Sequence, residues 1–302
     1  MITVELAKLL RRPRTWISVV LTCALPFMVA VFITVTHLVP PPGQGSAFLS
    51  AVLQDGALYP AAALALVLPV FLPVAVAVVA GDSIAGEATG GTLRYLLVRP
   101  VSRTRLLVAK LISVIVYVLV VLAVTFTAYA TGVFLLGPSE AAAVGQAPGV
   151  PGGAAGGSVP GLAGQAPTAG QAAGGAVTSL SGAPLSLLQL TERTAGAIAF
   201  ITVSMLGVAA IALFLSTITD SALGSALGAL AALVASEVLV TLNAATVVQP
   251  YLPTRYWLAW IDFFRQPVFW RDIQRGFGIQ AVYVVVFLAA AWANFSTKDI
   301  TA

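Results

Sequence analysis

Long apolar runs separated by short polar segments dominate this chain. The runs show no alternation of period two, so they predict helices rather than barrel strands, and a bilayer-spanning helix needs about 20 such residues. The six predicted spans are Trp16–Val39, Leu58–Ala80, Leu106–Leu136, Thr194–Leu215, Ala222–Val247 and Gly278–Phe295. The pattern therefore predicts an all-α membrane protein whose residues 1–302 form a single transmembrane domain.

The start of the chain has a different pattern. Ile2, Leu6, Leu9 and Leu10 share one face of a helix, and Pro13 interrupts the pattern before the first span. A short helix with one apolar face is typical of a segment that lies in the membrane interface. Residues 1–15 are therefore predicted to form an amphipathic interfacial helix on the cytoplasmic surface.

Two further segments between the spans are too polar to cross a membrane. Residues 138–190 are rich in Gly, Ala, Pro, Gln and Ser, with no charged side chain between Glu140 and Glu192. This composition predicts a flexible external loop. Residues 248–277 mix Trp, Tyr and Phe with Arg and Asp, which is typical of a membrane interface. There we expect amphipathic or re-entrant helices that cap the outer half of the bundle before the sixth span.

Composition and charge support a membrane protein and set its expected orientation. Hydrophobic residues make up 59% and charged residues 9% of the chain, and the net charge is +4. The basic residues cluster at the ends of apolar runs, which indicates membrane topology rather than nucleic-acid binding. The side that holds both termini and the five basic residues of 94–110 is richer in Lys and Arg, so both termini are predicted to be cytoplasmic. The basic residues expected on the external side are Arg193, Arg255, Arg265, Arg271 and Arg275.

The sequence lacks the usual motifs of nucleotide-binding, metal-binding and hydrolase sites. There is no G-x-x-x-x-G-K-[ST] phosphate loop, no H-E-x-x-H and no G-x-S-x-G. One histidine, His37, and one cysteine, Cys23, are too few for the common zinc clusters. We therefore expect no catalytic, cofactor-binding or metal-binding residues in this chain, which is predicted not to be an enzyme.

Glu237 is the most unusual ionisable residue, because it lies near the middle of the fifth predicted span. An ionised carboxylate at that depth costs about 3 kcal/mol or more unless it is paired or hydrated. It either lines a water-filled substrate cavity, with Asn243 one or two turns outward, or is a protonated or hydrogen-bonded packing residue. The sequence supports both interpretations equally.

The fifth span also carries a ridge of small residues at intervals of four. Such ridges allow another helix to approach closely. The pattern predicts a packing interface but leaves open whether the neighbour belongs to the same chain or to a second copy. The ridge residues are Gly224, Gly228, Ala232 and Ser236.

Residues 81–105, between the second and third spans, read as a folded cytoplasmic element. Thr92 is suited to cap a short helix that Pro100 ends. Its leucines share an apolar face with charged residues around it, which suggests a docking surface; the alternative is a basic anchor on lipid headgroups. The predicted docking residues are Glu87, Thr92, Leu93, Arg94, Leu96, Leu97, Arg99 and Arg103.

The stretch "AGEATGGTLRYLLVRPVSRTRLLVAKL", residues 85–111, resembles the pattern that follows the second helix in ABC-2 permeases, the membrane subunits of a family of ATP-binding-cassette exporters. The likeness rests on Glu, Gly-Thr-Leu, Leu-Leu, Arg-Pro, Ser-Arg and Lys in that order. The six spans, the turn "LSTITDSALGSALG" and the terminal "FSTKDI" are also similar to the family. The long Gly-rich loop departs from the family's common pattern.

This resemblance implies a function for the chain as a permease subunit. Residues 81–105 would be a coupling element that docks on a separate ATP-binding subunit, and that partner would bind ATP and Mg²⁺. Two such subunits and two permease chains, identical or paralogous, would form an exporter in the bacterial cytoplasmic membrane. The second and fifth helices would line the path of an amphipathic drug, lipid or peptide, and Pro69 and Pro73 fit a bent second helix.

Two other functions remain open from the residues alone. One is a proton-coupled secondary transporter that uses Glu237 as a proton relay. The other is an ATP-driven mechanical complex that acts on an external protein through the aromatic segment 248–277.

Overall fold

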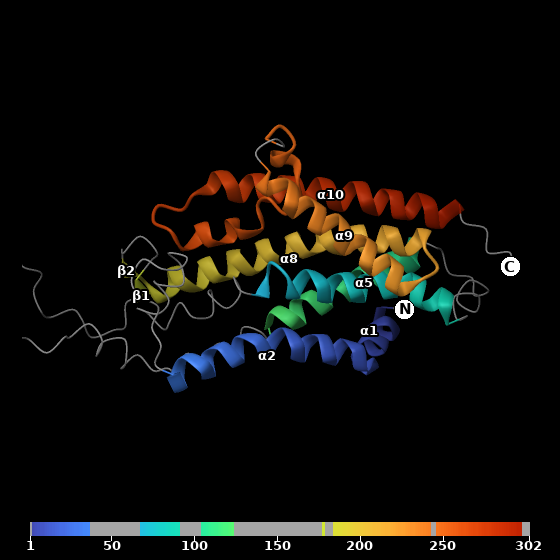
Figure 1. Cartoon of the computed structure of the whole chain (residues 1–302), viewed down its shortest axis with the longest axis horizontal. Helices are drawn as coiled ribbons and strands as arrows, with labels where there is room; N and C mark the ends of the chain where they lie inside the picture. Colours follow the sequence, from blue (N-terminus) through green and yellow to red (C-terminus); the bar gives the residue numbers. More distant parts are fainter. Residues whose placement is uncertain are drawn as a thin grey trace, which may run out of the picture.

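The computed structural model describes residues 2–36, 67–90, 104–123, 177–178, 184–242 and 246–297. Its long helices run side by side along the long axis of the molecule (Figure 1). The helical elements are α1 (Ile2–Arg11), α2 (Pro13–Thr36), α5 (Phe71–Thr89), the helix Thr104–Ala123, α8 (Leu187–Ile218), α9 (Ala222–Thr241), η3 (Gln249–Tyr251), η4 (Trp257–Phe264) and α10 (Trp270–Thr297).

The predicted all-α, multi-pass architecture is confirmed for the described residues. Five described helices are long and apolar enough to cross a membrane, and they overlap the second to sixth predicted spans. The first predicted span overlaps α2. The apolar stretch described within α2 is Thr15–Ala24, which is too short to cross a membrane. Five spans are thus described where six were predicted. The β structure in the described residues is one antiparallel pair, β1 (Val177–Thr178) and β2 (Pro184–Leu185).

Two spans have ends that differ from the prediction. α5 continues to Thr89, nine residues beyond the predicted end at Ala80. α8 begins at Leu187 rather than Thr194, because Ser186 and Gln189 form a capping box that satisfies the first amides of the helix. β1, β2 and the start of α8 fall in the predicted loop 138–190, whose residues 138–176 and 179–183 lie outside the described residues.

The aromatic segment also differs in detail. α10 begins at Trp270, so the last eight residues of the predicted cap at 248–277 belong to a spanning helix. The remainder holds η3 and η4, and η4 packs against α8 and α10 with Trp257, Trp260 and Phe263 buried. Aromatic rings therefore close the bundle beside the start of α10.

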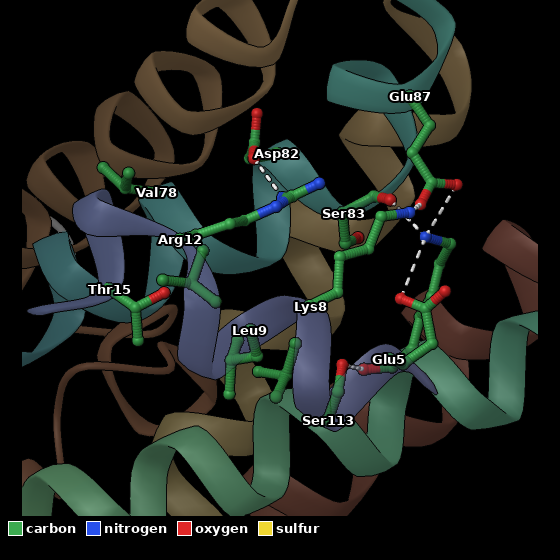
Figure 2. A pocket seen from close by; sticks show the side chains of 13 residues that line it. Glu5, Lys8, Leu9, Arg12, Thr15, Val78, Asp82, Ser83, Glu87 and Ser113 are labelled. Atoms are coloured by element: carbon green, nitrogen blue, oxygen red, sulfur yellow. Dashed lines mark hydrogen bonds and ion pairs between the residues drawn. The ribbon is translucent and has the colours of Figure 1, made fainter. Parts of the chain in front are cut away.

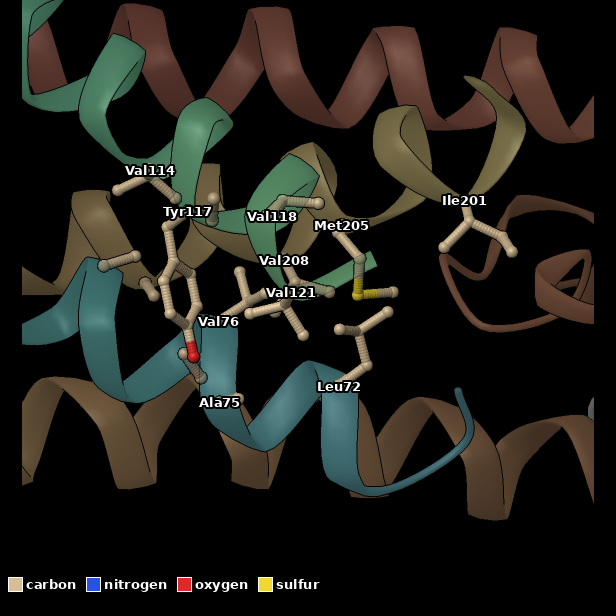
Figure 3. Close-up of a cluster of buried hydrophobic side chains, with 14 of the residues drawn as sticks. Leu72, Ala75, Val76, Val114, Tyr117, Val118, Val121, Ile201, Met205 and Val208 are labelled. Carbon is tan, nitrogen blue, oxygen red and sulfur yellow. The ribbon is translucent and has the colours of Figure 1, made fainter. Parts of the chain in front are cut away.

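Helix α8 is the centre of the fold. It contacts α5, α9, α10 and η4, whereas α2 packs on α5 at the side of the bundle (Figure 1). Figure 3 shows the core where α5, the helix Thr104–Ala123 and α8 meet. The side chains labelled there are Leu72, Ala75, Val76, Val114, Tyr117, Val118, Val121, Ile201, Met205 and Val208.

Candidate functional site

Two lysines from different helices hold one buried glutamate at one end of the bundle. The Nζ of Lys8, in α1, donates to Glu87 Oε1 at 2.5 Å, and the Nζ of Lys110, in the helix Thr104–Ala123, lies 3.0 Å from Glu87 Oε2 (Figure 2). The side chains of Glu87 and Lys110 are only 2% and 1% exposed. Glu87, near the end of α5, therefore joins three helices through ion pairs.

Three more side chains complete this ion-pair cluster. Lys110 also lies 3.7 Å from Glu5 Oε2 and donates to the backbone oxygen of Ser83 at 2.5 Å. Arg12 binds Asp82 at 2.5 Å (Figure 2). The cluster consists of Glu5, Lys8, Arg12, Asp82, Glu87 and Lys110. Three carboxylates thus face three cations, so the charges can balance without an external ion.

The cavity beside the cluster is small. Its volume is about 40 Å³, and Leu9, Thr15 and Val114 line it together with the charged groups. A volume of this size accommodates a few water molecules at most, since one water needs at least about 10–15 Å³. The cluster has no room for an amphipathic cargo, so it is suited to hold helices together rather than to bind a transported molecule.

The sequence of α1 explains how it reaches the cluster. Glu5, Lys8 and Arg12 are spaced by three and four residues, which places them on one helical face, and that face points into the bundle. The predicted apolar face is split in the structure: Leu9 is 9% exposed, but Leu10 is 49% exposed. Helix α1 therefore contacts the bundle through its charged side chains and through Leu9, which belongs to the hydrophobic core, and its placement on a membrane surface stays a prediction.

Beside the cluster, a serine of α8 binds the backbone of α5. The Oγ of Ser216 donates to the oxygen of Gly81 at 2.7 Å and accepts from the amides of Ile84 and Ala85 at 3.2 and 2.8 Å. The Oγ of Ser225, in α9, donates to the same Gly81 oxygen at 2.9 Å. Helices α5, α8 and α9 are thus fixed to one another one turn before Glu87.

Replacing Ser216 with alanine is expected to lower the free energy of unfolding by about 1–3 kcal/mol. The change removes three buried hydrogen bonds between α8 and α5 at once, and each contributes about 0.5–1.5 kcal/mol. Ser296→Ala, at an exposed site near the end of α10, is the matched control and should change stability by less than about 0.5 kcal/mol. Thermal unfolding of the purified variants in detergent measures both effects, and equal stability of the two variants would contradict the proposed role of Ser216.

The structure places only some of the predicted site residues. Glu87 is enclosed by lysines rather than presented at the rim of a docking surface. The other predicted docking residues, Thr92 to Arg103, lie outside the described residues, as does Asn243. Pro69 is exposed in the turn before α5, and Pro73 is buried in the first turn of that helix, where a missing amide breaks no hydrogen bond.

In α9, the fifth predicted span, Glu237 and the ridge of small residues lie on different sides of the helix. Glu237 is exposed, and exposed apolar side chains such as Val234 and Val238 share that side of the helix. In the ridge, Ser236 is buried and hydrogen-bonded to the hydroxyl of Thr254 at 2.8 Å, and Gly228 lies close to Leu215. Gly224 and Ala232 are exposed, so the ridge packs against the chain over only part of its length.

Sequence reasoning missed most of the ion-pair cluster. The sequence pattern places Lys110 among the five basic residues of 94–110 on the cytoplasmic side, and Lys8 and Arg12 in a surface helix, and it gives Asp82 no role. The available signal was the position of three acidic residues, Glu5, Asp82 and Glu87, close to or within apolar runs of a chain that has only 11 acidic residues. In the described part of the chain, no three His, Cys, Asp or Glu side chains gather closely enough to hold a metal ion.

Comparison with known proteins relates the first part of the chain to a transporter family. Residues 1–146 match the family model for the ABC-2 family transporter protein, and none of the curated proteins matches the chain. The matched segment contains all six residues of the ion-pair cluster. Permeases of this family are membrane transport components, generally not catalytic themselves, that usually work with an ATP-binding subunit. The resemblance predicted from residues 85–111 is therefore confirmed: residues 1–146, just under half of the chain, are similar to ABC-2 type permeases.

Proposed function

We propose that this chain is the permease subunit of an ATP-driven exporter that moves an amphipathic drug, lipid or peptide out of the cytoplasm or the inner leaflet. Two ATP-binding subunits would supply the energy, and a second permease chain would complete the path. The complex would lie in the bacterial cytoplasmic membrane with both termini of the chain in the cytoplasm. The family match supports transport, and the ion-pair cluster is the observation that supports coupling to a partner.

The cluster sits where force from a docked ATPase would enter the bundle. Residues 91–103, which hold most of the predicted docking residues, connect the end of α5 to the start of the helix Thr104–Ala123. Glu87 lies four residues before this segment and Lys110 seven residues after it, and the two are ion-paired. Because the pair closes the two ends of the segment, a displacement of the segment would move both helices together.

Helix α1 would move with them. Lys8 binds the same glutamate, and Arg12 binds Asp82 one turn earlier in α5. The link through Ser216 then joins α5 to the central helix α8. A push on residues 91–103 would thus reach four helices through these ion pairs and hydrogen bonds. A connected set of this kind is what a subunit driven by a separate ATPase requires.

The outward side of α9 supports a path between two permease chains. A carboxylate that faces hydrocarbon is costly, so Glu237 is expected to face water or a protein partner in the complete transporter. Val234 and Val238 beside it would give the path an apolar wall. An apolar wall with one carboxylate suits an amphipathic cargo.

Purification of the chain from its native membrane tests the proposed partner. An ATP-binding-cassette subunit is expected to co-purify in equal amount with the permease chain, and export in proteoliposomes should require ATP. Export that persists without ATP and follows a proton gradient would contradict the proposal and favour a secondary transporter. ATP hydrolysis with no cargo movement would instead favour the mechanical complex.

Truncating Leu96 and Leu97 to alanine should release the ATP-binding subunit. If both leucines are buried in the partner, their loss removes roughly 2 kcal/mol or more of docking energy. Leu188→Ala, at an exposed site at the start of α8, is the matched control and should leave the complex intact. Pull-down of the ATPase by the tagged permease measures the effect. Full retention of the ATPase by the double variant would show that residues 91–103 do not dock it.

A further inference from the structure

A second and larger cavity lies between α8, α9 and α10. Its volume is about 340 Å³, and its walls include Phe214 of α8, Ala232 and Leu239 of α9, Phe287 of α10 and Pro253 of the segment after η3. This is more than twice the volume of an engineered apolar cavity that binds benzene, about 150 Å³. Ala232 and Leu239 remain exposed, so the cavity is a groove that opens at the surface of the bundle.

The small residues of α9 explain why the groove is hollow. Gly228, Ala232 and Ser236 face aromatic side chains that pack on one another instead of filling the space. The rings of Phe214 and Phe287 meet edge to face at 5.5 Å, and those of Tyr283 and Phe287 stack at 5.9 Å. The groove narrows at Gly228, where a Cβ would lie 3.1 Å from Leu215 Cδ1.

The polar groups on the walls of the groove are already hydrogen-bonded. Ser236 pairs with Thr254, and the hydroxyl of Tyr283 donates to the oxygen of Tyr251 at 3.2 Å. Water needs two to four polar partners to occupy a cavity, and apolar cavities stay dry. Because α8, α9 and α10 are long and apolar enough to cross a membrane, lipid hydrocarbon is the apolar substance expected around the groove.

The shape of the groove fits a chain rather than a compact molecule. Its α9 wall runs from Gly228 to Leu239, eleven residues apart, which is about 16 Å along a helix that rises 1.5 Å per residue. The lining positions on α9 recur at the three- and four-residue intervals of one helical face. An extended alkyl chain lying along α9 would fill this length.

A basic residue lies next to one wall of the groove. Arg255 is two residues beyond Pro253, and its amide donates to the oxygen of Leu252, a wall residue, at 3.3 Å. Its side chain is exposed and makes no ion pair or hydrogen bond with another described residue. We propose that the groove binds one acyl chain of an anionic phospholipid of the bilayer, with the lipid phosphate at Arg255. This site needs neither ATP nor a second permease chain.

Photo-crosslinking in nanodiscs tests the site in the purified full-length chain. The probes are phosphatidylglycerol and phosphatidylcholine with a diazirine on one acyl chain, each diluted into unlabelled phosphatidylcholine. Phosphatidylglycerol is expected to label residues 228–239 and 283–287 more strongly than phosphatidylcholine does. Ala232→Phe should reduce this labelling at least about tenfold, since losing the burial of only about two methylene groups has that effect. Arg255→Gln should reduce the phosphatidylglycerol preference about fivefold, as expected for one exposed charge pair.

Matched variants keep the result interpretable. Ala281→Phe, on the exposed side of α10 outside the groove, should leave labelling unchanged. Ala235→Leu, a milder change on the groove wall, replaces Ala232→Phe if the latter does not fold. Equal labelling in the groove variants and in Ala281→Phe would overturn the proposal. A phosphatidylglycerol preference that is absent, or that survives Arg255→Gln, would overturn it as well.

Discussion

Replacing Glu87 with glutamine is expected to lower the free energy of unfolding by about 3–5 kcal/mol. The neutral amide would leave the buried Lys110 and the neighbouring Lys8 facing each other without the anion that now separates them. Removing one partner from a buried ion pair is costly because the remaining charge stays in a medium of low polarity. The unfolding of purified variants in mixed micelles measures this loss.

Two further variants test whether the loss of stability comes from the buried ion pair or from any loss of surface charge. In Glu87→Gln/Lys110→Met, the second buried charge is also removed, so the double variant should be more stable than Glu87→Gln alone. Arg12→Gln breaks the more exposed pair with Asp82, whose side chains are 33% and 15% exposed, and should cost about 1 kcal/mol or less. A double variant less stable than Glu87→Gln would contradict the ion-pair cluster as the source of the effect.

The same variant has a functional consequence under the proposed coupling. If Glu87 ties residues 91–103 to three helices, its loss should also weaken the link between ATP hydrolysis and export. Assayed below its lowered unfolding temperature, Glu87→Gln should retain the bound ATPase while cargo no longer stimulates hydrolysis. Leu96 and Leu97, in contrast, are expected to act through docking itself. The two sets of variants therefore distinguish loss of the partner from loss of transmission.

The apolar runs predicted where most helices lie. A membrane span must satisfy its backbone hydrogen bonds within the helix and needs about 20 apolar residues. The runs did not predict where α5 ends. The predicted span ends at Ala80, before the charges of Asp82 and Glu87, and an isolated charge inside the membrane is unfavourable. In the structure, Arg12, Lys8 and Lys110 neutralise both carboxylates, so the helix continues to Thr89. That end depends on contacts between residues 23, 70 and 79 positions apart, which a local pattern does not contain.

The candidate site, too, could be predicted from the sequence only in part. The stretch around Glu87 could be recognised from the order of its residues, and the family match agrees with it. The burial of Glu87 and the inward charged face of α1 could not be predicted, because an amphipathic helix can face lipid or protein with either side. Likewise, the ridge on α9 indicated close packing, but the large aromatic side chains opposite it pack on one another and leave a groove. Which surfaces meet is decided by tertiary contacts rather than by the periodicity of one helix.

Replacing Glu237 with glutamine is expected to reduce export of the cargo about tenfold without impairing folding. A charge-assisted hydrogen bond contributes about 1.5–3 kcal/mol, and the lower end of that range corresponds to roughly a tenfold change. Because Glu237 is exposed in the single chain, its free energy of unfolding should change by less than about 0.5 kcal/mol. Glu192→Gln, an exposed carboxylate near the start of α8, serves as the matched control and should export normally.

The driving force of the residual transport then decides between the two roles open to Glu237. In an ATP-driven exporter, Glu237→Gln should weaken export at every proton gradient while export still requires ATP, because the carboxylate only contacts cargo. In a proton-coupled transporter, the same change should abolish the response to the gradient, since glutamine cannot carry the proton. Full export of every cargo tested would place Glu237 outside the path altogether. In that case the outward side of α9 would be covered by a partner for stability alone, because a carboxylate facing lipid would still have to be shielded.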